Sequence, residues 1–344
     1  MTLKKLERTM KRTRKARDEL PCTDDPILEL RLLVNQHRAA TRARVAIENM
    51  CKDKEARQDI PARGLKKGDK IPCPLPDDVR HTFLNGNKAA DLQIGALERR
   101  IDRALRPIPI YDVFLRHVFG LGPVVSAYLV STVDIRKADK PSKLHRYCGL
   151  AVINGRLERR ESGRVSAYNS DLRTRLHQAA SAMRKNASSA SLTPEMRAER
   201  KRIREAAKEE GVKPKMPHID RTCTSKYLQA WEDHKHRILS SDRVEKGKIV
   251  PLHDGEPAGK AVSAQGFADN AGWHKAMRLL LEDVYVVWRA LEGLPVWPDY
   301  HAAKLGYAHG GRRIQVDEPR MLTVEEALEL VGDPGKISVA EAAE

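Results

Sequence analysis

Apolar residues recur every three or four positions along two long stretches of the chain, which is the pattern of amphipathic helices. In the first stretch, about residues 26–58, the apolar positions are Leu28, Leu32, Ala39, Ala43, Ala46 and Met50. In the second, about residues 87–106, they are Ala90, Ile94, Leu97, Ile101 and Ala104. The segment between them is rich in proline and is expected to be a loop. Two narrow apolar seams joined by a loop predict an antiparallel helical hairpin, or short coiled coil, over residues 25–107.

The rest of the chain also follows helical periodicity more than strand periodicity. Helices are expected at about residues 111–119, 124–133, 142–148, 170–187, 194–210, 226–239, 271–292 and 324–331. Thr193 precedes a proline, and Thr323-Val-Glu-Glu326 has the form of a capping box; both are signals of a helix start. Residues 149–166 are expected to form a short β-hairpin and residues 240–266 a polar connection. The predicted fold class is therefore mainly α.

These patterns divide the chain into six expected segments. They are a basic N-terminal arm (1–24), the helical hairpin (25–107), a helical core (108–190), a charged helix with an insertion (191–270), the C-terminal helix of the core (271–316) and an acidic tail (317–344). The longest stretch without a charge, Val118–Val133, is shorter than the about 20 apolar residues that span a bilayer, so no membrane partner is expected. The cysteines are few, far apart and without a CxxC pair, which favours a reducing, cytoplasmic location.

The uneven distribution of charge along the chain indicates what kind of partner the protein binds. The chain of 344 residues has 63 Lys and Arg against 47 Asp and Glu, a net charge of +16. Thirteen basic residues stand against four acidic ones in 136–185, whereas the segment 317–344 is acidic. A concentrated positive field is typical of a protein that binds a polyphosphate, because each neutralised phosphate releases counterions. The segment therefore favours nucleic acid as the partner, with a solvated basic face as the alternative.

Gly120-Leu121-Gly122 stands between two expected helices, in the form of a helix-hairpin-helix. Glycines at such a turn leave the main-chain N–H groups at the start of the second helix unshielded. Those donors and the helix dipole can hold a phosphate without contacting a base. The alternative is a simple turn between packed helices. Because the densest basic segment follows directly, Gly120 and Gly122 are expected to contact the DNA backbone.

Three further motifs extend this segment: Val118-Phe-Gly-Leu-Gly-Pro, Lys143-Leu-His-Arg-Tyr-Cys-Gly-Leu150, and Gly163-Arg-Val-Ser-Ala-Tyr-Asn-Ser-Asp-Leu-Arg173 followed by Ala179-Ala180. In this order they resemble the C-terminal transposase domain of the insertion-sequence one-ten family. The resemblance covers about residues 118–185 and extends weakly to 277–294. It implies a transposase-like helical core, DNA transposition and recombination, and a structured guide RNA as a second partner.

Full members of that family also have an N-terminal RNase-H-like domain with an Asp-Glu-Asp-Asp metal site, and then a coiled coil. Here no acidic strand precedes the helical hairpin, which corresponds to the coiled coil. No cofactor is therefore expected in this chain, and Mg²⁺ only if a partner supplies the nuclease. Other possible ligands, His218, Asp220 and Cys223 or His234 and His236, have no spacing that makes them converge, so no metal site is expected.

The family also uses a nucleophilic serine, and Ser162, followed by Gly163, is the candidate here. The position that the family would use reads Asn154-Gly155 instead. Nearby arginines could stabilise a pentavalent phosphate, whereas the alternative is that Ser162 is only a turn residue. The phosphate clamps expected in this region are Lys143, Arg146, Arg159, Arg160, Arg164 and Arg173.

The main hypothesis is a transposase-related DNA-binding protein that is catalytically incomplete or depends on a partner. The first alternative is an active serine-dependent recombinase that uses Ser162. The second is a non-catalytic interaction protein that acts through its coiled coil. Whether the chain is an enzyme is left open, and self-association through the helical hairpin is expected to be possible.

Overall fold

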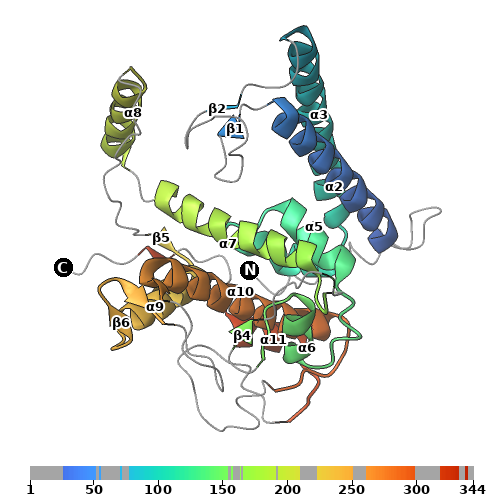
Figure 1. Ribbon diagram of the computed structural model, residues 1–344. Coiled ribbons are helices and arrows are strands. Elements are labelled where there is room, and N and C mark those ends of the chain that lie inside the picture. The colour runs from blue at the N-terminus through green and yellow to red at the C-terminus, as the bar shows by residue number, and fades with distance from the viewer. Residues whose placement is uncertain are drawn as a thin grey trace. The chain divides into compact units, whose positions relative to one another are not determined.

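The computed structural model describes residues 26–51, 54–55, 70–71, 77–153, 156–157, 163, 166–190, 193–209, 223–250, 261–298, 318–332 and 338–339. Helices dominate these residues, which confirms the mainly α class (Figure 1). The chain divides into two compact units, Glu7–Ile108 and a larger one that contains Pro109–Glu344. Within the described residues, no helix is long and apolar enough to cross a bilayer.

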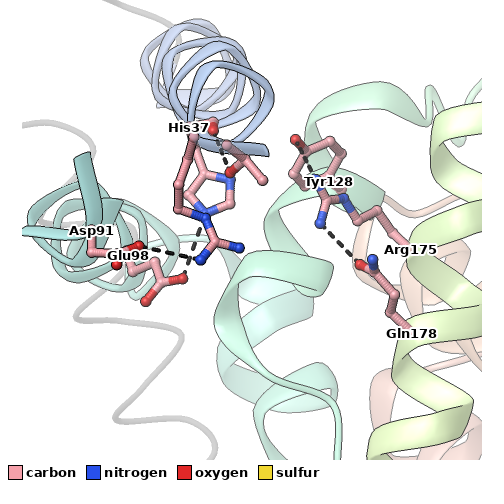
Figure 2. A network of polar contacts seen from close by, with 8 residues as sticks. His37, Asp91, Glu98, Tyr128, Arg175 and Gln178 are labelled. Atoms are coloured by element: carbon pink, nitrogen blue, oxygen red, sulfur yellow. Dashed lines mark hydrogen bonds and ion pairs between the residues drawn. The ribbon is translucent and has the colours of Figure 1, made fainter. Parts of the chain in front are cut away.

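The smaller unit is a pair of helices, α2 (Pro26–Cys51) and α3 (Asp77–Leu105). His37 Nε2 of α2 lies 3.5 Å from Glu98 Oε1 of α3. Seven residues further along α2, Arg44 Nη1 lies 3.4 Å from Asp91 Oδ1, which is seven residues earlier in α3 (Figure 2). The two helices are therefore antiparallel, as the sequence predicts.

The buried seam of α2 differs from the expected one. Leu30, Leu33 and Val34 are at most 3% exposed, whereas Leu28 and Leu32 of the expected stripe are 47% and 57% exposed. Since leucines occupy both faces of this stretch, periodicity alone does not distinguish the two stripes. The bounds also differ: α2 ends at Cys51 rather than near 58, and α3 begins at Asp77 rather than near 87.

The larger unit is built around one long helix, α10 (Ala264–Leu291), against which most of the other helices pack. These are α4 (Pro109–Val113), α6 (Pro141–Tyr147), α7 (Ser170–Ala190), α9 (Lys226–Leu239) and α11 (Val324–Val331) (Figure 1). α9 approaches most closely, because a Cβ on Gly272 would lie 2.2 Å from Trp231 Cδ1. The glycine therefore admits the indole, which buries the apolar side of α10.

A buried carboxylate joins three of these helices. Asp283 of α10 is 6% exposed and accepts a hydrogen bond of 2.8 Å from the Tyr227 hydroxyl of α9. It also forms an ion pair with Lys226, whose ammonium donates to the Val331 carbonyl of α11 at 2.8 Å. The buried charge is thus paired and hydrogen-bonded, as burial requires.

A buried guanidinium holds the connection between α5 (Pro123–Thr132) and α6 against α10. Arg289 is 3% exposed and donates to the carbonyls of Ile135 at 3.1 Å, Ala138 at 2.9 Å and Pro295 at 2.6 Å. The Tyr285 hydroxyl donates to the carbonyl of Asp139 in the same connection. These contacts fix the segment that leads into α6.

The strands are two residues long each. β3 (Val152–Ile153) and β4 (Arg156–Leu157) pair antiparallel and confirm the expected β-hairpin. The polar connection expected at 240–266 instead contains a three-stranded sheet of β6 (Val244–Glu245), β7 (Lys248–Ile249) and β8 (Val262–Ser263). Two more pairs are β1 (Lys54–Glu55) with β2 (Lys70–Ile71), and β5 (Cys223–Thr224) with β9 (Ser338–Val339). Two-residue strands are too short to show the alternation by which strands are predicted.

The helix-start signals give the expected elements. α8 (Pro194–Glu209) begins after Thr193, whose hydroxyl accepts from Met196 N at 3.3 Å. α11 has the predicted capping box between Thr323 and Glu326. α9 has the predicted bounds at both ends.

Candidate nucleic-acid interface

The glycine turn leads from the 3₁₀ helix η2 (Leu115–His117) into α5. Gly120 has φ +77°, a left-handed conformation that favours glycine. Gly122 has φ −78° and is the N-cap residue of α5, so its backbone would accept other residues. The single helix expected over residues 111–119 is instead two short helices. The α-helix α4 ends at Val113, and the 3₁₀ helix η2 covers Leu115–His117.

The two glycines have different surroundings. A Cβ on Gly120 would lie 2.7 Å from the Cα of Met183 in α7, whereas a Cβ on Gly122 would meet nothing within 4 Å. Gly122 is exposed, and no side chain caps α5. The first N–H groups of a helix have no acceptor within it. The turn is therefore packed on one side and leaves an open helix N-terminus on the other.

Exposed basic side chains follow α5. Lys140, Lys143 and Arg146 recur at every third position through α6, and all three are exposed. Pro141 starts the helix, and Leu144 and His145 occupy its buried face. Two more exposed cations, Arg136 and Lys137, lie in the turn before α6. The burial of one face of α6 thus directs its cations to solvent.

Carboxylates partly neutralise this basic face. Lys143 Nζ lies 2.8 Å from Asp139, and this hydrogen bond lowers the pKa of the Asp139 carboxyl. Arg136 lies 3.1 Å from Glu292. Ion pairs at the surface contribute little, so a phosphate can replace these partners. In the described part of the chain no ion pair holds Arg146.

Arg173 lies in the first turn of α7, which Asn169 caps by accepting from Leu172 N at 3.1 Å. Its guanidinium carbon is 5.2 Å from the centre of the Tyr168 ring, and its Nη2 is 3.4 Å from His274 Nε2 of α10. Gly149 of the Gly-Leu motif has φ +71°, and a Cβ there would lie 2.4 Å from Tyr168 Cδ2. The glycine therefore makes room for the tyrosine that supports Arg173.

Arg175, two residues later, joins α7 to α5. Its Nη2 donates to the Tyr128 hydroxyl at 3.2 Å, and its Nη1 donates to Gln178 at 2.9 Å (Figure 2). The guanidinium carbon also lies 4.5 Å from the centre of the Tyr128 ring. Arg175 has no local signal in the sequence, because its partner, the buried Tyr128, lies on a different helix.

These contacts place the predicted residues in two groups. Gly120 lies beside Met183, whereas Tyr128, in the middle of α5, lies beside Arg175. Ten residues of α7 separate Arg173 from Met183, which is about 15 Å of helix. Arg173 and Arg175, with Tyr128 from the middle of α5, form one group, and the glycine turn with the start of α5 forms another. A phosphate on the turn is not within reach of Arg173, so one phosphate cannot contact both.

The remaining predicted residues are placed as follows. Arg159, Arg160, Arg164 and the candidate nucleophile Ser162 lie outside the described residues. Among the aromatic residues of the unit, Tyr285 and Trp288 are 0% and 5% exposed and belong to the core. Tyr147 is 40% exposed and donates its hydroxyl to the Thr132 carbonyl at 2.9 Å.

Histidines in the described residues show no metal-binding arrangement. No group of three His, Cys, Asp or Glu side chains among those residues could hold a metal ion. His234 Nδ1 instead lies 3.0 Å from Arg237 Nη2. His218 and Asp220 lie outside the described residues.

The comparison with protein families matches the segment that holds both groups. Residues 113–193 match the Transposase IS116/IS110/IS902 family. This segment is similar to the transposase domain of that family. It runs from the end of α4 through α5, α6, the β3–β4 hairpin and α7, and it makes up less than half of the chain. The resemblance predicted over 118–185 is therefore confirmed, while residues 277–294 lie beyond the match. Neither the curated proteins nor the solved structures gave a match to the chain.

Proposed function

We propose that this protein binds DNA during transposition and that the transposase domain holds the sugar–phosphate backbone. The exposed cations of α6 carry the proposal, because they lie inside the segment that matches a transposase family. Lys143 and Arg146 present two charges on one short helix, and its N-cap residue Lys140 adds a third. Arg173 adds a fourth on α7, and the open N-terminus of α5 offers backbone donors to a further phosphate.

The binding mode expected from this arrangement is contact with phosphates rather than with base edges. Lysine and arginine side chains on a convex helix surface fix the register of a duplex without reading its sequence. The two groups of contacts, separated by about 15 Å along α7, would engage different phosphates. Affinity should therefore depend strongly on salt and only weakly on sequence.

Charge reversal tests this proposal. Lys143→Glu with Arg146→Glu should reduce the affinity for a fluorescent duplex at least ten-fold, measured by anisotropy. The control is Arg197→Glu with Lys201→Glu, which makes the same charge change at exposed positions of α8, outside the matched segment. If both double variants lose affinity equally, net charge alone attracts DNA and the α6 site is wrong.

For the chemistry, we infer that the chain needs a partner for strand transfer. Its candidate nucleophile is Ser162, and the position that the family would use for its serine reads Asn154-Gly155 instead. Purified protein is incubated with supercoiled DNA and Mg²⁺. Intact plasmid supports dependence on a partner, whereas nicking or a covalent protein–DNA adduct that is lost in Ser162→Ala establishes an active serine recombinase.

A structured RNA and a second copy of the chain are the other proposed partners. Self-association is supported by Leu28, Leu32 and Leu92, which are exposed apolar residues on the helical hairpin. Leu28→Glu with Leu32→Glu should convert a dimer to a monomer in light scattering, and an unchanged mass would argue against this surface. Competition between RNA and duplex DNA in the anisotropy assay tests the RNA.

A further inference from the structure

A polar stripe runs along the otherwise buried helix α10. Asn270, His274, Arg278 and Glu282 recur at every fourth position and are all at least partly exposed. The helices α7, α9 and α6 pack against α10 (Figure 1). They leave this polar face partly exposed: Asn270 is exposed, and the other three residues are half-buried.

Cations converge on this stripe. Arg173 of α7 reaches His274, and the carbonyl of Arg278 lies 3.2 Å from His145 Nε2 of α6. Arg278 Nε is buried and has no hydrogen-bond acceptor among the described residues. Burial, with the charge of Arg173 acting in the same direction, lowers the pKa of His274 to about 3. The histidine is therefore neutral at pH 7 and adds a hydrogen-bonding ring without a charge.

Of the two nearby carboxylates, Asp269 is paired with cations and Glu282 lies beside a neutral histidine. Asp269 accepts from Lys235 at 2.8 Å and from Arg184 at 3.4 Å. Glu282 lies 3.7 Å from His145, whose burial lowers its pKa to about 3 and leaves it neutral. Neither carboxylate cancels the field at His274, since the charges of Arg173 and Arg278 both still lower the pKa of that histidine.

Aromatic rings lie next to these cations. Trp273 is tilted against His274, with ring centres 3.8 Å apart, and His177 of α7 meets Trp273 edge-on at 4.8 Å. Tyr168 lies under Arg173. His177 is exposed, and Tyr168 and His274 are half-buried. Aromatic rings that alternate with guanidinium groups are the arrangement by which proteins bind unpaired nucleotides.

We propose that Tyr168, Arg173, His177, His274 and Arg278, here termed the α7–α10 platform, bind a single-stranded segment of nucleic acid. The proposal rests on the proposed DNA binding and specifies the form of the ligand at this surface. The two arginines contact successive phosphates, while an unpaired base stacks on the exposed ring of His177. A duplex cannot make the stacking contact with the histidine ring, because the faces of its bases are already stacked on each other.

The test compares two ligands and two variants. Binding of the full chain to a single strand and to a duplex of the same length is followed by anisotropy at one salt concentration. His177→Ala should weaken binding of the single strand about ten-fold and leave the duplex within two-fold, since stacking on one ring contributes on this scale. His177→Phe, which keeps an aromatic face, should restore the affinity for the single strand. His177 is exposed, so neither change should alter the thermal midpoint by circular dichroism.

A second readout uses Trp273, which touches both histidine rings. A single strand should quench tryptophan emission in the wild type, and His177→Ala should reduce this quenching. An unchanged affinity of His177→Ala for the single strand, or an equal loss for both ligands, would refute the platform while DNA binding stands. If the chain binds neither ligand, the proposed function is refuted as well.

Discussion

A Cβ atom on Gly120 would lie 2.7 Å from the Cα of Met183, closer than packed carbon atoms approach each other. The turn before α5 therefore rests directly on the backbone of α7. Gly122, two residues later, has neither this contact nor a left-handed backbone. The two glycines of one motif thus have separate roles: Gly120 allows packing, and Gly122 leaves the N-terminus of α5 open.

The first prediction follows from this difference. Gly120→Ala should destabilise the protein by at least about 2 kcal/mol, because a left-handed alanine is strained and its methyl group meets the backbone of α7. Gly122→Ala should change the free energy of unfolding by less than about 1 kcal/mol. Urea unfolding followed by circular dichroism measures both.

Substitutions at Gly120 and Gly122 also distinguish an effect on stability from an effect on DNA binding. A β-branched residue at Gly122 should leave the fold intact and reduce DNA affinity, because its side chain shields the N–H groups of α5. Equal destabilisation by Gly120→Ala and Gly122→Ala would show that the turn does not pack on Met183 in solution.

A second prediction concerns the buried guanidinium of Arg289. Arg289→Met should cost about 3 kcal/mol or more, because it leaves the carbonyls of Ile135 and Ala138 without donors. The control, Arg136→Met, removes an exposed ion pair with Glu292 near the same end of α10 and should cost less than about 1 kcal/mol. Thermal unfolding measures both, and similar midpoints for the two variants would contradict the role given to Arg289.

The parts of the fold that the sequence predicts are those with a local physical cause. Thr323 and Glu326 are three residues apart, and their capping box depends on nothing beyond that turn. Gly120 likewise signals its own left-handed backbone. The seam of α2 has no such local cause: Leu28 and Leu30 are equally apolar, and only packing against α3 decides that Leu30 is buried.

The candidate interface follows the same rule. The cations of α6 are found from sequence, because they form one dense segment. The cluster of Arg173, His177 and His274 is not, because about a hundred residues separate the α7 members from the α10 member. Only the antiparallel approach of two helices brings them together.

A third prediction is the pH dependence of stability. His145 is 5% exposed, and burial lowers its pKa to about 3, with the charge of Arg278 acting in the same direction. An unfolded histidine titrates near 6.5. Between these values the unfolded chain binds the extra proton, so stability is complete above about pH 6.5 and is lost as the pH falls.

The loss of unfolding free energy is up to about 1.4 kcal/mol per pH unit for one such histidine. Urea unfolding at pH 7.5, 6.0 and 5.0 should show this loss, and His145→Gln should flatten it while lowering the stability at pH 7.5. A profile that is identical in wild type and variant would contradict the prediction, because it would mean that the pKa of His145 is the same in the folded and the unfolded chain.

The last prediction concerns salt. If α6, Arg173 and the start of α5 contact about six phosphates, affinity for a duplex should fall about 10³-fold between 50 and 200 mM salt. Lys143→Gln with Arg146→Gln should lower the slope of log affinity against log salt by about 2, because each lost phosphate contact removes nearly one released counterion. Neutral replacements are used so that no repulsion is added. The matched control, Arg197→Gln with Lys201→Gln on α8, should keep the wild-type slope. A flat salt response in the wild type would remove phosphate contact as the basis of binding, whereas an equal reduction in both double variants would mean that the contacts are spread beyond the transposase domain.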